Sequence, residues 1–370
     1  MPWNWELPDW PHFKYDRDLV SQQERQFLLS IGSSLAFLKN IGEKDYNQFV
    51  VEILSVEGLE SSRIEGEILN RESLQSSIKH HFGLTSSRKR ESNKESGMAH
   101  LLCNVYESFD NPLTHEMLWK WHAQLFSDQS HIADRGKYRT HIEPMQIVSR
   151  QYASSRVFFE APPSMQVADE MTAFIDWFNS TSPSEPILGR AAIAHVYFES
   201  IHPFEDGNGR IGRILVEKVL SQGVERPTLI AVSKVLEKRK KEYYEALAQC
   251  NRTLQIDHWV KFFADAILQA QGESINLLYF LIEKFKLFTS LSGQLNLRQE
   301  KALVRMFAEG LSGFKGGLSA ENYIAITKTS RATATRDLMD LVHKGALVKT
   351  GELRHTRYWL NLSKRLLSDA

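Results

Sequence analysis

The sequence has 370 residues, too many for one ordinary domain, so two or three domains are expected. Hydrophobic residues make up 42% of it and charged residues 24%, as in a globular protein with a buried core. Lys and Arg together number 45, and so do Asp and Glu, which excludes an overall charge that draws the chain to nucleic acid or to an anionic membrane. Any such binding site must be local.

The N-terminus, MPWNWELPDWPHF, lacks the basic start and the apolar run of a signal peptide. No stretch reaches the ~18 consecutive apolar residues that a membrane-spanning helix needs. The two cysteines, Cys103 and Cys250, stand among apolar residues in helix-like segments, which favours reduced core thiols over a disulfide or a metal pair. We therefore expect a cytoplasmic protein that does not associate with a membrane.

The N-terminal region, residues 1–95, is predicted to be helical. Apolar residues at a period near 3.6 predict one helix over residues 22–39, and a second is expected over about 45–60. The polar stretch from Thr85 to Ser96 has almost no apolar residue and predicts an exposed loop or linker.

The central region, residues 97–285, is predicted to be helical with one interruption. Amphipathic spacing predicts helices over residues 98–108, 114–126, 167–178, 190–201, 209–220 and 237–251. Thr114 is expected to open the second of these. The interruption, Met145–Ala161, contains two short strand-like runs and predicts a β-hairpin that ends at Pro162 and Pro163.

The C-terminal region, residues 295–370, changes character. Helices are expected over residues 298–307, 319–326 and 331–343, with Ser330 as the cap of the third. Residues 347–362 then predict two strands around a glycine-containing turn. This order of elements is similar to a winged helix-turn-helix module. The expected fold is therefore mainly α, with a hairpin in its core and a winged-helix-like domain at its C-terminus.

The most informative segment is His202–Arg213, HPFEDGNGRIGR. Pro203 disfavours helical geometry in the residue before it, so a helix should end near His202 and the next should begin at about Gly209. The loop between them leads into a helix N-terminus, where the backbone N–H groups of Gly207, Asn208 and Gly209 can bind anionic oxygens.

The charged side chains of this segment fit nucleotide chemistry. Arg210 and Arg213 are three positions apart, so they lie on the same face of the helix, and guanidinium groups grip phosphates well. Asp206 offers a hard oxygen ligand for Mg²⁺. His202 has the pKa of a general base for a hydroxyl. Phe204 is expected to anchor the loop in the core. The alternative is a glycine-rich turn with a buried histidine and two surface arginines.

The pattern H-x-F-x-[DE]-G-N-G-R-x-x-R, complete in this sequence, resembles the active-site motif of the Fic family. The resemblance implies a Fic-type helical core with a hairpin flap. It also implies transfer of AMP from Mg-ATP to a Tyr, Thr or Ser hydroxyl of a protein, with pyrophosphate leaving. In that reaction His202 is the base, Asp206 the Mg²⁺ ligand and Gly207–Arg210 the phosphate cradle, while Arg213 holds the γ-phosphate.

A second motif, SSRIEG from Ser61 to Gly66, resembles the inhibitory pattern [ST]-x-x-x-E-[GN] of the same family. The resemblance implies that Glu65 lies on Arg213 and blocks productive binding of the γ-phosphate, while Ser61 helps to hold the helix. A carboxylate and a phosphate compete for the same guanidinium group. The alternative is a solvated glutamate at the end of a helix.

Other regions correspond to binding elements of the family. Tyr243 and Asn251 resemble its adenine- and ribose-contacting residues, with core packing as the alternative, above all for Tyr244. The cation run Lys238–Lys241 favours a solvated helix face over attraction of nucleotide or target. The hairpin corresponds in position to a target-docking flap, whose exposed strand edge binds a target by β-addition. The candidate flap residues are Val157, Phe158, Phe159 and Glu160.

Basic residues in the C-terminal module allow a contact with DNA phosphates. Arg331 and Arg336 lie on the expected recognition helix, and Lys349, Arg354 and Arg357 lie on the expected wing. Winged helices also serve as protein-interaction or packing modules, so both interpretations stay open.

Together these features predict an AMP transferase inhibited by Glu65, with ATP and Mg²⁺ as co-substrate and cofactor and a protein hydroxyl as acceptor. A homodimer, common in relatives of this architecture, is also expected, and a dimer allows self-modification by AMP transfer within or between subunits. The alternatives are removal of AMP, transfer of another nucleotide, and a nucleotide-sensing winged-helix DNA-binding regulator. The intact His202 and Asp206 favour an enzyme, because a sensor needs the anion cradle but no base.

Overall fold

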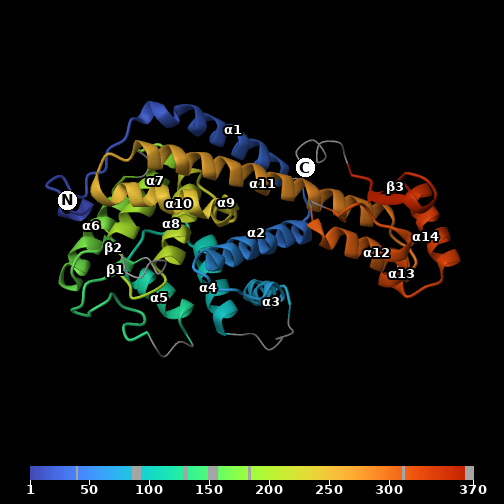
Figure 1. Cartoon of the computed structure of the whole chain (residues 1–370), viewed down its shortest axis with the longest axis horizontal. Helices are drawn as coiled ribbons and strands as arrows, with labels where there is room; N and C mark the ends of the chain where they lie inside the picture. The colour runs from blue at the N-terminus through green and yellow to red at the C-terminus, as the bar shows by residue number, and fades with distance from the viewer. Residues whose placement is uncertain are drawn as a thin grey trace. The chain divides into compact units, whose positions relative to one another are not determined.

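The computed structural model describes residues 1–38, 41–85, 93–127, 132–148, 157–181, 185–310 and 313–362, with the backbone alone for residues 33–37. The chain is mainly α, as predicted, and divides into two compact units (Figure 1). The first contains residues 1–39 and 50–274, and the second contains residues 40–49 and 275–370. The predicted boundary near residue 96 therefore lies inside the first unit.

The first unit contains most of the helices. Its α-helices are α1 (Ser21–Leu38), α2 (Glu43–Ile64), α3 (Arg71–His81), α4 (Asn93–Glu107), α5 (His115–Leu125), α6 (Val167–Ser180), α7 (Ile187–Ile201), α8 (Asn208–Gly223), α9 (Val232–Lys238), α10 (Lys240–Gln249) and α11 (Asp257–Ser290). Its 3-10 helices are η1 (Asn4–Glu6), η2 (Arg17–Val20), η3 (Ser164–Gln166) and η4 (Cys250–Arg252). Helices α2 and α11 also have residues in the second unit.

Several helices begin where the sequence predicted. Thr114 caps α5, because its hydroxyl accepts the Met117 N–H at 3.2 Å. Helix α2 is longer than predicted and reaches Ile64, so Ser61 lies in its last turn. In Figure 1 this end of α2 approaches α8.

Two sequence predictions are wrong in detail. The polar stretch expected to be a loop supplies the first turn of α4, where Glu95 is 5% exposed and accepts the Asn70 N–H at 2.7 Å. A buried hydrogen bond therefore outweighs the polar composition; residues 86–92 of the stretch lie outside the described residues. The helix expected over residues 237–251 is interrupted at Arg239, which ends α9 and precedes α10.

Helix α7 lies at the centre of the first unit. Every residue from Leu188 to Ile201 is buried, so the helix is covered all round rather than along one face. The amphipathic pattern predicted here was therefore wrong, although the helix itself is confirmed. On one side Trp259 donates to the Ala192 carbonyl at 2.8 Å and its ring stacks on His195. This packing gives the residues at the end of α7 a rigid base.

The predicted hairpin is confirmed. Strands β1 (Gln146–Val148) and β2 (Val157–Glu160) pair antiparallel, with Gln146 opposite Glu160 and an irregularity between Ile147 and Val148. The connection between the strands, residues 149–156, lies outside the described residues.

The second unit has helices followed by a two-stranded sheet, in the order that the sequence predicted. Its elements after α11 are α12 (Leu297–Ala308), α13 (Ala320–Thr327), α14 (Arg331–His343), β3 (Leu347–Thr350), η6 (Leu353–His355) and β4 (Arg357–Leu360). Ser330 caps α14 by accepting the Thr333 N–H at 3.3 Å. The strands pair antiparallel, with Leu347 opposite Leu360. The winged-helix assignment of this unit remains a prediction.

The helices that the structure describes differ from a membrane-spanning helix in length, in apolarity or in both. None of them combines the length and the apolarity needed to cross a bilayer.

Candidate active site

The predicted catalytic segment connects α7 to α8. Helix α7 ends at Ile201, and His202 follows with φ 50° and ψ 60°, in the left-handed region that residues other than glycine rarely adopt. Its N–H still donates to the Phe198 carbonyl at 3.0 Å. Pro203 favours this break, because a proline disfavours helical geometry in the residue before it. A residue held in this conformation is common at functional sites.

The loop after His202 is held by contacts within itself. The Phe204 N–H donates to Oδ1 of Asn208 at 2.9 Å, and Nδ2 of Asn208 donates to the Phe204 carbonyl at 2.8 Å. Phe204 is fully buried, as predicted, and stacks on His122 with ring centroids 4.2 Å apart. The Asn208 side chain therefore shapes the loop, and its contribution to an anion site is its backbone N–H.

Gly207 stands where the loop enters α8. It has φ 81°, a conformation that favours glycine, and a Cβ here would lie 2.7 Å from the Phe126 ring. The first N–H groups of a helix have no acceptor within the helix and attract anions. The predicted phosphate cradle of Gly207, Asn208 and Gly209 therefore lies at a helix N-terminus, as expected from the sequence.

Arg139 ties this loop to the end of the flap, and sequence reasoning missed it. Its side chain is almost fully buried; Nε donates to the His202 carbonyl at 2.9 Å, and Nη2 donates to the Pro162 carbonyl at 2.5 Å. Burial lowers the pKa of Arg139 to about 10, so it stays charged at neutral pH. Its partners are 23 and 63 residues away in sequence, so no local pattern marks it.

The imidazole of His202 is mostly buried, with 14% of the side chain exposed, and its Nδ1 lies 3.7 Å from Oε2 of Glu199. Burial, reinforced by the charge of Arg139, lowers the pKa of His202 to about 4. At neutral pH the ring is therefore uncharged, which is the form that accepts a proton as a general base. Glu199, also missed in the sequence, has a pKa raised to about 8 by burial and by the charge of Glu65.

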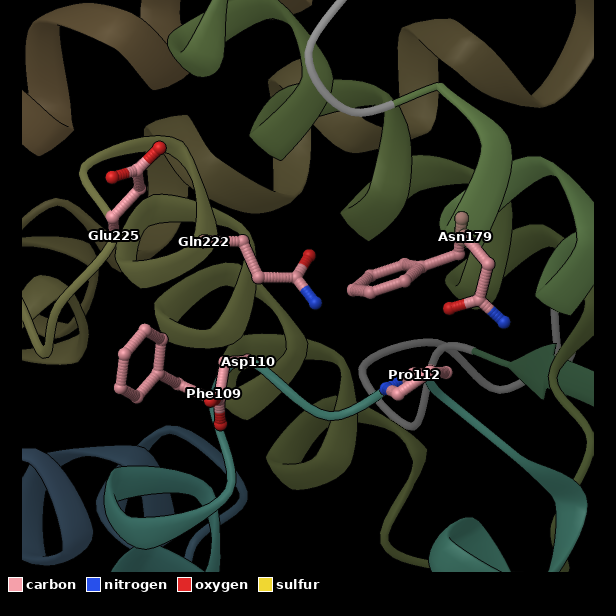
Figure 2. Close-up of a pocket in the computed structure, with 7 residues that line it drawn as sticks. Phe109, Asp110, Pro112, Asn179, Gln222 and Glu225 are labelled. Carbon is pink, nitrogen blue, oxygen red and sulfur yellow. The ribbon is translucent and has the colours of Figure 1, made fainter.

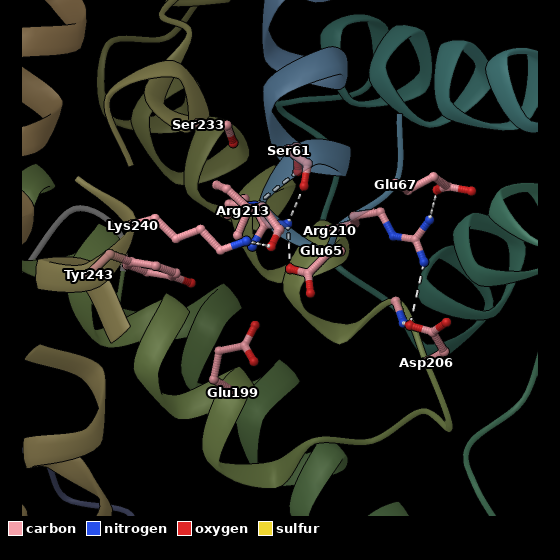
Figure 3. A network of polar contacts seen from close by, with 12 residues as sticks. Ser61, Glu65, Glu67, Glu199, Asp206, Arg210, Arg213, Ser233, Lys240 and Tyr243 are labelled. Atoms are coloured by element: carbon pink, nitrogen blue, oxygen red, sulfur yellow. Dashed lines mark hydrogen bonds and ion pairs between the residues drawn. The ribbon is translucent and has the colours of Figure 1, made fainter. Parts of the chain in front are cut away.

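The end of α2 lies on Arg213, which is 2% exposed. Nη2 of Arg213 lies 2.8 Å from Oε1 of Glu65, and Nε donates to Oγ of Ser61 at 2.9 Å (Figure 3). Burial alone would raise the pKa of Glu65, but Arg213 outweighs it and holds this pKa below its ordinary value. Gly209 makes room for the pair, since a Cβ there would collide with the Glu65 carboxylate. The structure thus brings together Glu65 and Arg213, the two residues that the family resemblance had paired.

Arg210 contacts a different carboxylate, which the sequence did not single out. Its Nη1 donates to Oε2 of Glu67 at 2.6 Å, and its Nη2 lies 3.5 Å from Oδ1 of Asp206. Arg210 is 4% exposed, and its guanidinium carbon lies 4.9 Å from the centre of the Phe126 ring. Both arginines of the motif therefore reach the segment that ends α2, and each has its own acidic partner.

Two family models match the chain. One, described as a domain of unknown function (DUF4172), matches residues 3–84. The other, described as the Fic/DOC family, matches residues 112–220, which include the loop and both arginines. The chain contains a Fic domain. Ser61 and Glu65 precede this domain and lie in the region that the first model matches.

Curated relatives of the Fic domain are named as protein adenylyltransferases. One from Nematostella vectensis, protein adenylyltransferase Fic, is 33% identical over 129 residues, which cover 34% of this chain and 28% of the relative. A probable protein adenylyltransferase of Aquifex aeolicus (strain VF5) is 37% identical over 62 residues, or 17% of this chain and 19% of the relative. The chain therefore spans less than a third of the length of these relatives.

Solved structures share the fold. A Fic family protein from Desulfovibrio desulfuricans G20 has a TM-score of 0.52 and 21% identity, covering 92% of this chain and 96% of that one. Fic-1 from C. elegans has a TM-score of 0.50 and 20% identity, covering 73% of this chain and 74% of that one. At these identities the likeness establishes the fold alone.

The predicted adenine contacts lie in and after α10, outside the matched Fic domain. Tyr243 is 1% exposed and its hydroxyl bonds Nε2 of His195 at 2.8 Å. A ring buried in this way offers no face to a nucleotide base, so the predicted stacking role does not fit this conformation. Tyr244 is 42% exposed and is the accessible ring of the pair. Asn251 is partly exposed, and its Nδ2 donates to the Phe158 carbonyl at 3.2 Å.

The outer edge of the flap is covered. The Ala161 N–H donates to the Met145 carbonyl on the β1 side. The carbonyls of Phe158 and Glu160 point to the other side by the alternation of a strand. They accept bonds from the Asn251 side chain at 3.2 Å and from the Trp5 indole at 2.7 Å. A target strand that adds to this edge must first displace both side chains.

The flap side chains differ in accessibility. Val157 and Phe158 are 36% and 44% exposed, so they can contact a partner. Phe159 is 3% exposed and packs edge-on against Trp3, with ring centroids 5.4 Å apart. Of the predicted docking residues, Phe159 is therefore a core residue that holds the flap on the N-terminal segment.

Asp206 suits the predicted Mg²⁺ role. Its side chain is 51% exposed at the rim of the loop, and its Oδ1 accepts the Gly207 N–H at 2.5 Å. Within the described residues, no three His, Cys, Asp or Glu side chains gather to hold a metal by themselves. Mg²⁺ that accompanies a nucleotide usually takes one or two carboxylates and completes its shell with phosphate oxygens and water. A single half-exposed carboxylate fits that donor set.

A cavity of about 440 Å³ lies away from the catalytic loop (Figure 2). Its lining residues are Phe109, Asp110, Pro112, Phe178, Asn179, Gln222 and Glu225. Gln222 is near the C-terminal end of α8, whereas the motif lies at its N-terminal end, so about 20 Å of helix separates them. This cavity is therefore not the nucleotide site.

Proposed function

We propose that this protein is an adenylyltransferase, which moves AMP from ATP to a Tyr, Thr or Ser hydroxyl of a target protein or of itself. The observation that carries the proposal is the position of His202 at the lip of a loop that leads into a helix N-terminus, with Arg213 in the first turns of that helix. The names of the curated relatives of the Fic domain support the same reaction.

In the proposed reaction the hydroxyl oxygen attacks the α-phosphorus of ATP and its proton passes to His202. The bond from the α-phosphorus to the bridging oxygen breaks, and pyrophosphate leaves. Nδ1 of His202 faces Glu199, so Nε2 is the nitrogen that accepts the proton. The N–H groups at the start of α8 and both motif arginines offset the phosphate charge. Asp206 would hold Mg²⁺, which would supply further positive charge beside the phosphates.

The same proposal includes an inhibited resting state. Glu65 occupies Arg213, which is the predicted γ-phosphate ligand, at 2.8 Å. A carboxylate and a phosphate compete for one guanidinium group. Productive binding of ATP therefore requires the end of α2 to release Arg213.

The test uses ATP labelled at the α-phosphate, with Mg²⁺, purified protein and lysate. The variants are the wild type, Glu65→Gly and Glu65→Gly/His202→Ala, and label on protein is followed on a denaturing gel. Label should rise at least tenfold in Glu65→Gly, because transfer is no longer blocked, and disappear when His202 is also removed. Absence of label in every variant, with folded protein, would contradict ATP as the donor.

A second candidate function belongs to the second unit, which we propose binds DNA through phosphate contacts. Arg331 and Arg336 on α14 are exposed, as are Lys349 on β3 and Arg354 in η6. The test is a mobility shift of a DNA duplex by the whole protein at low and at physiological salt. Binding that weakens steeply with salt and is reduced by Arg336→Ala would support it. No shift at low salt would favour a protein-interaction role.

A further inference from the structure

The segment that ends α2 contacts more than the predicted arginine. Oε1 of Glu65 lies 2.8 Å from Arg213, and Oε2 of Glu67 accepts a hydrogen bond from Arg210 at 2.6 Å. In addition, Nζ of Lys240 donates to the Ile64 carbonyl at 2.5 Å. Figure 3 shows these cations arranged around the same short segment. Four consecutive residues, 64–67, thus present one oxygen acceptor group to each of three cations.

Burial makes these contacts more than surface ion pairs. Arg210 and Arg213 are 4% and 2% exposed, and a buried cation is costly unless an anion accompanies it. If segment 64–67 moves away, Arg213 loses its carboxylate and Arg210 keeps only Asp206, at 3.5 Å. Lys240 loses the carbonyl that accepts its hydrogen bond. The three cations then need another anion, one with several oxygen atoms along a chain, to neutralise them.

We propose that residues 64–67 form an internal anion that occupies the binding site of a nucleotide's phosphate chain. Glu67 is then a second inhibitory carboxylate, acting on Arg210, and Lys240 becomes a phosphate-binding residue when the segment withdraws. This inference rests on the proposed function, because it assigns further residues to the same nucleotide site.

The charges of the segment and of the ligand support this exchange. Glu65 and Glu67 carry two negative charges and Ile64 adds a helix C-terminal carbonyl, which also attracts a cation. A triphosphate likewise offers several oxygens along one chain and satisfies arginine and lysine in the same way. The inhibitory segment and the phosphate chain therefore exclude each other, and either one neutralises the buried cations.

This arrangement predicts that removal of Glu65 releases only part of the site. In Glu65→Gly, Arg210 still has Glu67 at 2.6 Å. The substitution Glu67→Gln keeps the size of the side chain but removes its charge, so Arg210 becomes available to phosphate. Glu67 also pairs with Lys94 at 2.8 Å, and glutamine can retain a polar contact there.

The first experiment measures ATP affinity by titration calorimetry with Mg²⁺. Every variant carries His202→Ala, so that binding is measured without transfer. Affinity should rise from this parent to Glu65→Gly, and again by about 3–10-fold when Glu67→Gln is added. The matched control is Glu60→Gln, on the same helix and paired with Arg63, which should add less than a twofold change.

The second experiment tests Lys240 in the unlocked variant that carries His202→Ala, Glu65→Gly and Glu67→Gln. Lys240→Met should weaken ATP binding by about 5–10-fold. Lys241→Met, at a neighbouring lysine that is 89% exposed, is the matched control and should change binding less than twofold. Inorganic triphosphate should show the same difference between the two lysines, because the proposed contact is to phosphate and not to the base.

The outcomes separate the two proposals. If no variant binds ATP, the proposed function fails. If Glu65→Gly raises ATP affinity but Glu67→Gln adds nothing, or if Lys240→Met and Lys241→Met behave alike, the proposed function stands and the internal-anion inference is overturned. Circular dichroism and the Tm of each variant show that the chain remains folded, so an unchanged affinity cannot be blamed on unfolding.

Discussion

The catalytic loop and the inhibitory segment are built in opposite ways. In the loop, Phe204 and Asn208 bond each other across four residues, and the Gly207 N–H bonds the side chain of the residue before it. In the inhibitory segment, Ser61 and Glu67 bond arginines that are 152 and 143 residues away. The proposed catalytic loop is thus held by contacts within one stretch of chain, whereas the proposed inhibitory contacts depend on tertiary packing.

This difference has a functional consequence. A change in the loop alters the position of groups that must touch the nucleotide, so activity should fall. A change in the segment removes contacts that only the inhibited state needs, so activity should rise while the loop keeps its shape. The comparison is therefore tested by asking whether substitutions in the loop lower AMP transfer while substitutions in the segment raise it.

The largest effect is expected inside the loop, from Gly207→Ala in the Glu65→Gly background. Gly207 has φ 81° and a Cβ would press on the Phe126 ring, so the loop must move. AMP transfer should fall by about 100-fold, as when a positioned donor is lost. The control is Gly83→Ala, at φ 67° with no neighbour within 4 Å of a Cβ, measured by the same label transfer. Equal activity of the two variants would show that the loop tolerates displacement.

A smaller effect of opposite sign is expected from Glu57→Ala on α2. Glu57 is 6% exposed, and its carboxylate accepts the N–H of Ser233 at 2.9 Å and also the Ser233 hydroxyl. Its loss leaves a buried donor unpaired, at about 1–3 kcal/mol, and loosens α2. Label transfer should rise by about tenfold, and Tm should fall by a few degrees.

The control for Glu57 is Glu60→Ala, which lies about one helical turn nearer the inhibitory segment and is paired with Arg63. It should leave both label transfer and Tm close to those of the wild type. If Glu57→Ala lowers Tm without raising transfer, Glu57 stabilises the fold but does not hold the inhibitory segment.

A still smaller rise is expected from Ser61→Ala. Arg213 loses the Ser61 hydroxyl at 2.9 Å but keeps the Ser61 carbonyl at 2.8 Å and Glu65. Loss of one hydrogen bond is worth about 1 kcal/mol, so transfer should rise by about fivefold or less. The control is Ser62→Ala, at a buried serine whose hydroxyl has no hydrogen-bond partner among the described residues. Equal rates of label transfer in the two variants would show that the Ser61 hydroxyl does not contribute to inhibition.

The sequence could predict the loop because its determinants are neighbours in the chain. Pro203, the glycines and the spacing of the arginines are visible in one short segment. The same segment also predicts where α7 ends and where α8 begins. The pairing of Glu65 with Arg213 came only through resemblance to a family, since nothing local connects residues 148 positions apart. Arg139, Glu67 and Lys240 were missed or left as surface charges for the same physical reason: tertiary packing chooses their partners.

Burial decides which of the predicted binding residues are accessible in this structure. Tyr243 and Tyr244 are alike in the sequence, yet only packing decides that Tyr243 faces His195 while Tyr244 faces outward. The flap edge was predicted to be open because periodicity cannot show that Trp5, more than 150 residues earlier, covers it. Patterns identify elements, but exposure is a property of the packed molecule.

The smallest effect tests how the two regions meet, at Glu199. Burial, then the charge of Glu65, raises the pKa of this carboxyl to about 8. A pKa raised by folding gives a contribution to stability that is full below the unfolded pKa, near 4.5, and is lost as pH rises through about 8. The wild type should therefore lose stability between about pH 4.5 and pH 8, and Glu199→Gln should lose less, by about a few degrees in Tm.

Thermal unfolding of the wild type, Glu199→Gln and the exposed control Glu245→Gln across this range measures the effect. The control should follow the wild type, since the Glu245 side chain is 61% exposed. Glu65→Gly should move the pH at which stability falls to a lower value, because one of the causes of the raised Glu199 pKa is then gone. Identical pH profiles for wild type and Glu199→Gln would mean that Glu199 is already ionised beside His202. The inhibitory segment would then influence Arg213 but not the proton balance at the base.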